Sequence, residues 1–262
     1  MDNVEMLSTK EFNGKAKSAA EAKRKLVLAN RILAMEGVVD AYGHVSIRNP
    51  ENPDSFFISR ALAPAYVSED DIMECAVHGG AVFPNYTAMK PYGERIIHAS
   101  VYARRSDINA IVHAHPAALI PFTACDVPFN IVFHSSSMFY DGIPMYEISE
   151  QSGLHISTIE EAEKMAQSME DKHGLFIRNH GVVVGFGMLP QVVMASVYLS
   201  QAAEILQKTL AMGGKPQSVS YNEAKKSTDF LFGEIGLARS WEYWVRRTKE
   251  TYPDLDFSEG TR

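Results

Sequence analysis

The chain has 262 residues, with 25 Lys or Arg against 32 Asp or Glu, so its formal net charge is −7 when the histidines are neutral. A hydrophobic content of 46% and a charged content of 22% exclude a disordered chain, and the acidic balance argues against nucleic acid as a partner because phosphate binding needs a basic face. Two cysteines are too few for a disulfide framework, and no apolar run reaches the length of a membrane span. The first residues are polar and lack the apolar core of a signal peptide, so we expect a cytoplasmic protein that binds neither nucleic acid nor a membrane.

The first ninety residues predict one helix followed by three strands. Ser18 and Glu21 form a candidate capping box, apolar residues then recur on one helical face, and Gly37 is typical of a helix end. The strands and turns that we predict after this helix are 44–48, a turn over 49–54, 55–59, a strand after 70–72 and a turn over 78–80.

The rest of the chain alternates helices and strands. Pro91 is typical of a helix start, and Thr158 with Glu161 forms a second candidate capping box. The sequence Asn-His-Gly at 179–181 separates two apolar runs and predicts a β-hairpin. The predicted helices are 91–105, 158–173, 190–212 and 222–252, and the predicted strands are 107–115, 130–134, 144–148, 175–179 and 182–186.

Strands and helices are interspersed without a linker rich in Pro, Gly or Ser, which favours one layered α/β domain. We place this domain at residues 18–215, between a flexible N-terminal segment over 1–17 and a helical C-terminal tail over 216–262. The tail is expected to pack on the domain or on a neighbouring subunit. Its aromatic cluster, which we expect in the core or at a subunit contact rather than in a lid, is Trp241, Tyr243 and Trp244.

Three of the nine histidines have a spacing that suits a metal ion. His113 and His115 end an apolar strand, and residues two apart on a strand point to the same face. His180 lies in a turn between two apolar runs, although each of the three also fits a solvated residue near a turn. Three neutral imidazoles with an open position suit Zn, Mn, Fe or Co as a Lewis acid. The histidines that we assign to the surface are His78, His155 and His173.

Glu94 and several residues near strand ends are the other candidates for chemistry. Glu94 opens the helix after Pro91, where it is either a carboxylate favoured by the helix dipole or a functional group, namely a general acid/base or a fourth ligand when substrate is absent. His44 and Arg60 are either a carboxylate-binding pair or a satisfied histidine and a surface charge. His134 ends a predicted strand and has the same two interpretations.

Four motifs together resemble the class II aldolase/adducin family. They are G-H-V-S-I-R at 43–48, K-P-Y-G-E-R-I-I-H-A-S-V-Y at 90–102, I-V-H-A-H-P at 111–116 and N-H-G-V-V-V-G at 179–185. They occur in the order typical of the family and span most of residues 20–212. The combination is far more specific than any single motif.

The resemblance implies a three-layer α/β/α single domain with a central, mostly antiparallel sheet. It also implies a homotetramer whose active sites lie at subunit interfaces. His113, His115 and His180 match the metal ligands of the family, and Glu94 matches its catalytic carboxylate. Adducin-like members that lack these residues are not catalytic, so the presence of all four favours an enzyme.

Departures from the family pattern concern the substrate. Sugar-phosphate aldolases of the family usually have Asn at the position of His44, a Thr-Gly pair near Ala61–Leu62, and two serines at Tyr92 and Gly93. Those small polar groups bind phosphate, so their replacement disfavours a phosphorylated substrate. Residues 43–67 instead resemble the aromatic-acid decarboxylase branch, which includes hydroxypyridine-dicarboxylate and dihydroxyphthalate decarboxylases.

We therefore expect a divalent-metal-dependent decarboxylase of a hydroxylated aromatic or heteroaromatic (di)carboxylate. The metal, which is Mn, Zn, Co or Fe, would be chelated by the hydroxyl and carboxylate oxygens of the substrate, with Glu94 as acid/base and either Glu94 or His44 as the proton donor to carbon. The substrate-binding residues that we expect are Arg60, Ser46, His134, Tyr92 and Tyr140. Two alternatives use the same ligands, namely an aldolase of a non-phosphorylated hydroxy-keto acid and an iron(II) oxygenase, and a third is a non-catalytic binding module as in adducin.

Overall fold

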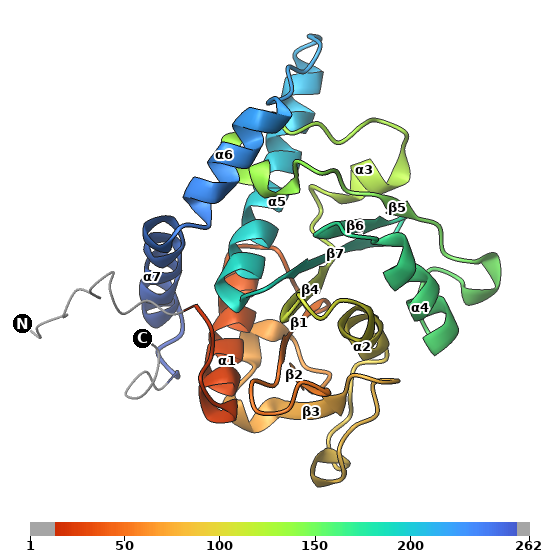
Figure 1. Cartoon of the computed structure of the whole chain (residues 1–262), viewed down its shortest axis with the longest axis vertical. Helices are drawn as coiled ribbons and strands as arrows, with labels where there is room; N and C mark the ends of the chain where they lie inside the picture. The colour runs from red at the N-terminus through yellow and green to blue at the C-terminus, as the bar shows by residue number, and fades with distance from the viewer. Residues whose placement is uncertain (1–13, 256–262) are drawn as a thin grey trace, which may run out of the picture.

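The chain folds around a seven-stranded sheet that has helices on both faces (Figure 1). The structure, a computed structural model, describes residues 14–255, so the predicted flexible segment 1–17 lies outside the described residues except for its last four. The strand order is β3-β2-β1-β4-β7-β6-β5. All neighbouring strands are antiparallel except β5 and β6, which confirms the mostly antiparallel sheet. The strands are β1 (His44–Arg48), β2 (Ser55–Ser59), β3 (Ile72–Ala76), β4 (Ala110–Ala114), β5 (Met145–Tyr146), β6 (Gly174–Ile177) and β7 (Gly181–Phe186).

Side chains that alternate along the strands form two hydrophobic cores, one on each face of the sheet. On β4, for example, Val112 packs in one core and its neighbour Ile111 packs in the other. The first face is covered by α1 (Ala19–Met35), α5 (Leu189–Ala211) and α7 (Glu234–Thr251), and the second by α2 (Arg95–Arg104) and α4 (Ile159–Ser168). This is the predicted α/β/α arrangement, and it places α2 directly against β1 and β4.

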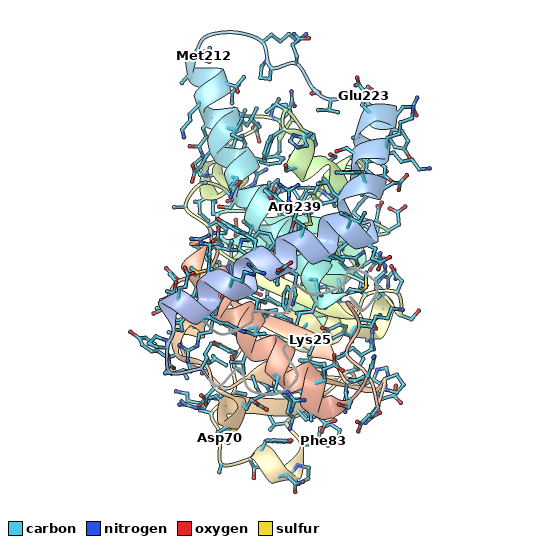
Figure 2. The ribbon with its side chains drawn as sticks, turned by 90° about the vertical axis from the view of Figure 1, so that its left-hand side faces the viewer. Lys25, Asp70, Phe83, Met212, Glu223 and Arg239 are labelled. Carbon is cyan, nitrogen blue, oxygen red and sulfur yellow. The ribbon has the colours of Figure 1, made fainter. Side chains whose placement is uncertain are left out.

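The C-terminal part of the chain forms two helices where the sequence predicts one. Phe232 and Gly233 separate α6 (Tyr221–Leu231) from α7, and Gly233 is the N-cap residue of α7. Figure 2 shows α7, labelled at Arg239, crossing over α1, labelled at Lys25. Trp241 and Trp244 are buried in this contact, whereas Tyr243 is exposed. The two tryptophans are therefore core residues of this chain.

The strand predicted over 130–134 is wrong. Residues 130–133 have no regular structure, because the carbonyl of Ile131 accepts a hydrogen bond from the N–H of Val219 at 2.8 Å rather than from a sheet neighbour. His134–Phe139 then form a 3₁₀ helix, η5, which packs against α6. A short helix, α3 (Ile120–Ala124), precedes this region.

Two further elements are shorter than predicted. The strand expected over 144–148 contains only the two residues of β5, at the edge of the sheet. The helix expected to end near His173 ends at Ser168, before Glu170 takes a positive φ of 50°. Within residues 14–255, no helix is long and apolar enough to cross a membrane.

Candidate metal centre

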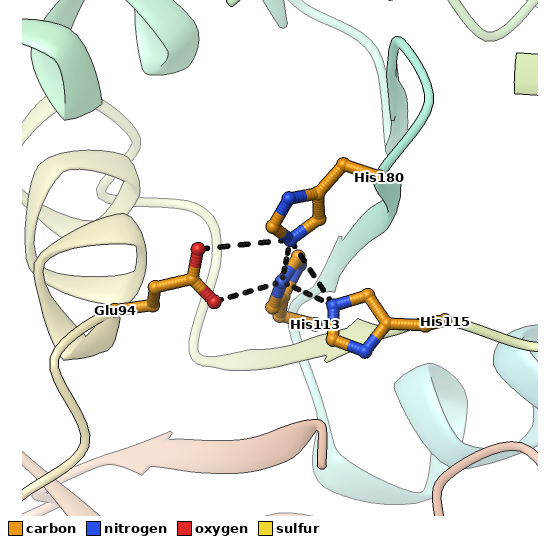
Figure 3. Close-up of side chains that lie close together, drawn as sticks. All are labelled: Glu94, His113, His115 and His180. Carbon is orange, nitrogen blue, oxygen red and sulfur yellow. Dashed lines mark hydrogen bonds and ion pairs between the residues drawn. The ribbon is translucent and has the colours of Figure 1, made fainter. Parts of the chain in front are cut away.

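The neighbouring strands β4 and β7 bring three histidines together at one end of the sheet. His113 lies on β4, His115 follows the last residue of this strand, and His180 lies in the turn that leads into β7. The Nε2 atom of His113 is 3.0 Å from that of His115 and 3.1 Å from that of His180, and the remaining pair is also 3.1 Å apart. The structure thus places the three predicted ligands around one point (Figure 3).

The turn before β7 allows this close approach. Asn179 has a positive φ of 53°, a conformation that Asn tolerates better than most residues. Gly181 lies so close to β4 that a Cβ atom at this position would collide with the carbonyl oxygen of Ala114 and with the ring of His115. The Asn-His-Gly sequence therefore packs the imidazole of His180 against the end of β4.

Backbone carbonyls fix the proton position in two of the three imidazoles. His113 Nδ1 donates to the carbonyl oxygen of Val182 at 3.1 Å, and His180 Nδ1 donates to that of Leu154. A carbonyl oxygen can only accept, so Nδ1 carries the hydrogen in both neutral rings. Each ring consequently presents an unprotonated Nε2 to the centre of the cluster, as metal-binding histidines commonly do.

A divalent cation fits between these nitrogens. Unprotonated Nε2 atoms 3.0–3.1 Å apart repel one another unless a positive charge lies between them. Metal–nitrogen bonds of about 2.0–2.1 Å in a tetrahedral site give nitrogen–nitrogen distances of about 3.3–3.4 Å, close to the observed spacing. Burial and the nearby His113 together lower the pKa of His115 to about 3, and they also lower the pKa of His180, so these imidazoles are neutral as metal ligation requires.

Glu94 is the fourth member of the cluster. It is the N-cap residue of α2, yet its carboxylate makes no capping hydrogen bond and points toward the histidines (Figure 3). Its Oε2 atom is 3.5 Å from His113 Nε2, and its Oε1 atom is 3.6 Å from His180 Nε2. The backbone N–H of Ile156 donates to Oε1 at 3.2 Å and orients the carboxylate.

The carboxylate of Glu94 is ionised at neutral pH. Burial raises its pKa, but the hydrogen bond from the N–H of Ile156 lowers it, as would a cation held by the three imidazoles. An ionised carboxylate beside three imidazoles can either join them as a ligand or accept a proton from a bound molecule.

A cavity of about 670 Å³ opens onto this cluster. This volume lies within the range of sites for small organic ligands. In addition to Glu94, His115 and His180, the residues that line the cavity include Tyr42, His44, Tyr92, Leu154, His155 and Asn179. The combination of aromatic rings and a few polar groups suits a planar polar ligand.

Two of the predicted catalytic and substrate-binding residues line the cavity together. The rings of His44 and Tyr92 have centroids 4.7 Å apart. The hydroxyl of Tyr92 donates to the carbonyl oxygen of Leu62, which fixes the ring beside His44. The space near Leu62 is thus occupied by a phenol ring rather than by small hydroxyl side chains.

The structure does not bring the other predicted substrate-binding residues to the cavity wall. Ser46 faces the same side of the sheet as His44, but its side chain is fully buried. Arg60 pairs through Nε with Asp71 Oδ1 at 2.6 Å. His134 and Tyr140 lie at the two ends of η5, beside α6.

Sequence reasoning assigned no role to two histidines of this region. His155, which we assigned to the surface, lies on the rim of the cavity with its Nδ1 atom 3.9 Å from Glu94 Oε1. His98 is fully buried behind His44. The spacing of four residues between Glu94 and His98 puts both on one helical face, so the sequence could have indicated that His98 lies near the site. His155 lies in an irregular loop, where no sequence pattern indicates its position.

Comparison with known proteins identifies the family. The sequence matches the Class II Aldolase and Adducin N-terminal domain over residues 24–207. The chain belongs to the class II aldolase/adducin family. It is 27% identical to the decarboxylase tropJ of Talaromyces stipitatus over 86% of this chain and 93% of that protein. It is 24% identical to a 3,4-dihydroxyphthalate decarboxylase of Arthrobacter keyseri over 87% and 94% of the respective chains.

These relatives place the chain in the decarboxylase branch of the class II aldolase/adducin family and indicate an enzyme. A solved structure of an aldolase II superfamily protein from Pseudomonas syringae superimposes with a TM-score of 0.76 at 21% identity, over 92% of this chain and 96% of that one. The likeness confirms the predicted class II aldolase fold.

Proposed function

We propose that this protein is a divalent-metal-dependent decarboxylase of a hydroxylated aromatic or heteroaromatic (di)carboxylate. His113, His115 and His180 would hold the ion, which is Mn, Zn, Co or Fe. When bound, the ion would supply a Lewis acid for the adjacent hydroxyl and carboxylate oxygens of the substrate. The observation that carries the proposal is the convergence of three unprotonated Nε2 atoms and one ionised carboxylate at a cavity with aromatic walls. The two decarboxylase relatives support it.

In this proposal Glu94 moves the proton. Its carboxylate is ionised, so it can accept the proton of the substrate hydroxyl, whose acidity the bound ion would raise. The resulting carboxylic acid then returns this proton to the ring carbon that bears the leaving carboxylate. The bond to the carboxylate breaks, its electron pair restores the aromatic ring, and carbon dioxide leaves. The N–H of Ile156 keeps the carboxylate of Glu94 in place throughout.

The position of Tyr92 supports a substrate without phosphate. In the sugar-phosphate aldolases of this family, small residues near this position bind phosphate. Here the ring of Tyr92 lies against His44, and its hydroxyl is already paired with the carbonyl of Leu62. An aldolase of a non-phosphorylated hydroxy-keto acid remains the second candidate, because aldolases also occur among the relatives.

Turnover by separately metal-loaded samples tests this function. The protein would be loaded with manganese, cobalt, zinc or anaerobic iron(II) and offered hydroxylated aromatic dicarboxylates, with products followed by mass spectrometry. We expect loss of carbon dioxide from at least one compound, abolished by a chelator, and one deuterium at the vacated carbon in heavy water. Cleavage of hydroxy-keto acids without decarboxylation would favour the aldolase, and oxygen consumption with iron would favour an oxygenase.

We further propose a cytoplasmic homotetramer with active sites at subunit interfaces. On the rim of the cavity, Tyr42 is 73% exposed and the side chain of His155 is 78% exposed, so a neighbouring subunit has room to complete the wall. Light scattering should give about four times the chain mass of 29.1 kDa. A fully active monomer would contradict interfacial sites, and recovery in the membrane fraction of disrupted cells would contradict the location.

A further inference from the structure

Four buried polar side chains, of which His44 is the first, form a continuous hydrogen-bonded chain. His44 Nδ1 is 2.7 Å from His98 Nε2, and His98 Nδ1 is 2.6 Å from Ser46 Oγ. Ser46 Oγ is in turn 2.8 Å from the hydroxyl of Tyr102. None of these residues is more than 3% exposed, so water does not compete for the bonds. The chain begins at the cavity and ends between the sheet and α2.

The fold brings these residues together from two elements. His44 and Ser46 are two apart on β1 and therefore face the same helix. His98 and Tyr102 are four apart on α2 and therefore share one helical face. Apolar side chains would suffice to pack this interface, so two imidazoles and two hydroxyls here require another explanation. Paired polar groups in a dry interior also fix one another's orientation.

The distances favour one direction of donation along the chain. The hydroxyl of Tyr102 can donate to Ser46 Oγ at 2.8 Å or to the carbonyl oxygen of Asn109 at 3.5 Å, which is the limit for a hydrogen bond. If Tyr102 donates to Ser46, then Ser46 donates to His98 Nδ1. His98 Nε2 then donates to His44 Nδ1, and His44 must carry its own hydrogen on Nε2. In the opposite direction the phenol oxygen accepts from Ser46, and the buried phenol hydrogen is left with only the long bond to Asn109.

We propose that His98, Ser46 and Tyr102 are positioning residues that hold His44 in the Nε2–H tautomer, so that it offers a neutral hydrogen-bond donor to a substrate carboxylate. His44 lines the cavity, and its Nε2 has no hydrogen-bond partner within residues 14–255. The carboxylate in question is a second one, away from the metal ligands. The identity of this ligand rests on the proposed function, whereas the tautomer does not.

Nitrogen NMR of the zinc-loaded protein, labelled with ¹⁵N at histidine, reads the tautomer directly. Zinc is diamagnetic, and the signals of His44 and His98 are assigned through their loss in His44→Gln and His98→Gln. We expect Nε2–H on both rings. Hydrogen on Nδ1 of His44, with an unprotonated Nε2, would overturn the proposal without any need for an active enzyme.

Removal of one hydroxyl tests the role of Tyr102. Tyr102→Phe keeps the ring but removes the donor that sets the direction, so His44 should then populate both tautomers. The matched control is Tyr198→Phe, which removes a half-buried phenol hydroxyl on α5 that has no hydrogen-bond partner in the described part of the chain. We expect one tautomer in the control. A single Nε2–H tautomer in both variants would remove Tyr102 from the proposal.

Binding of two probes tests the ligand. Salicylate and 3-hydroxyphthalate both have a hydroxyl beside a carboxylate, but the second probe has one carboxylate more. We expect the zinc-loaded protein to bind 3-hydroxyphthalate about tenfold more tightly, the value of one hydrogen bond to a charged group. Tyr102→Phe should reduce this ratio at least threefold, and Tyr198→Phe should not. Equal binding of both probes would show that His44 does not bind a second carboxylate. Failure of the proposed decarboxylation would appear only in the turnover experiment, so the two failures can be distinguished.

Discussion

Glu94 combines two properties that sequence alone leaves as alternatives. It stands at the start of a helix, but its carboxylate contacts histidines from two strands rather than the N–H groups of its own helix. A helix start is a rigid place from which to hold a side chain, and Ile156 fixes the direction of this one. The position at the helix start and the role in the site are therefore compatible.

Glu94→Gln should abolish turnover while leaving the metal bound. The amide keeps the shape of the side chain but cannot accept and return a proton, so we expect a loss of at least about 100-fold in kcat. Three imidazoles remain to hold the ion, and metal content by mass spectrometry should be unchanged. Glu160→Gln, on the exposed side of α4, is the control. Full activity of Glu94→Gln would remove this residue from the mechanism.

His113 is the proposed ligand with the most constrained surroundings. It is fully buried, and Val182 fixes its tautomer. We expect His113→Asn to weaken zinc affinity by at least about 100-fold, since loss of an outer hydrogen bond alone costs up to that much. His78→Asn, in the exposed turn after β3, should bind zinc as the wild type does. Calorimetric titration measures both, and equal affinities would show that His113 is not a ligand.

At the scale of elements, one loop orients two members of the site. The segment between β5 and α4 supplies the carbonyl of Leu154 to His180 and the N–H of Ile156 to Glu94. Glu161 on α4 holds the start of this loop, because its carboxylate accepts hydrogen bonds from Tyr146, Ser149 and Ser152. Glu161, which is not part of the cavity wall, thus supports the geometry of the proposed metal ligands.

Glu161→Gln should destabilise the protein in a pH-dependent way. Burial raises the pKa of this carboxyl, but the four hydrogen bonds outweigh burial and lower it. The stabilisation is therefore fully present above the unfolded value of about 4.3 and is lost as the pH falls through the lowered folded value. We expect a difference of about 1–3 kcal/mol in the free energy of unfolding at pH 7.

Urea unfolding at pH 7, 5 and 4 checks this expectation, with Glu163→Gln on the exposed face of α4 as the control. The gap between wild type and Glu161→Gln should shrink at the lowest pH. A gap that is independent of pH would show that the charge of Glu161 contributes nothing.

At the scale of the whole molecule, the metal should stabilise the global fold. The four site residues lie between positions 94 and 180, on α2, β4 and the turn before β7, so no single element can form the site by itself. At free zinc of 100 times the dissociation constant, we expect about 2.7 kcal/mol of additional stability. Thermal and urea unfolding with zinc and with a chelator measure it, and at the same free zinc His113→Asn should gain at most about 0.4 kcal/mol. Equal stability of wild type with and without zinc would contradict a site formed only by the folded chain.

The sequence predicts most of the sheet and the ligand set because both follow from local patterns. Strand periodicity puts His113 and His115 on one face, and the Asn-His-Gly turn puts His180 beside them. The false strand at 130–134 has the right composition, but the carbonyl of Ile131 accepts its backbone hydrogen bond from Val219, 88 positions further along the chain. Ser46 shows the same limit, because the pattern cannot tell a side chain that faces the cavity from one that faces His98.

The pairing of β4 with β7 restricts where residues can be inserted into the chain or deleted from it. His113 lies opposite Val183, and neighbouring residues on β4 face the other core. One inserted or deleted residue between 110 and 113 would turn the imidazole into that core and destroy the site, although all four site residues would still be present in the chain. The exposed connection at 213–217, between the labelled Met212 and Glu223 in Figure 2, carries no such constraint. It is therefore the place where a fused domain or tag can be inserted while the active site is retained.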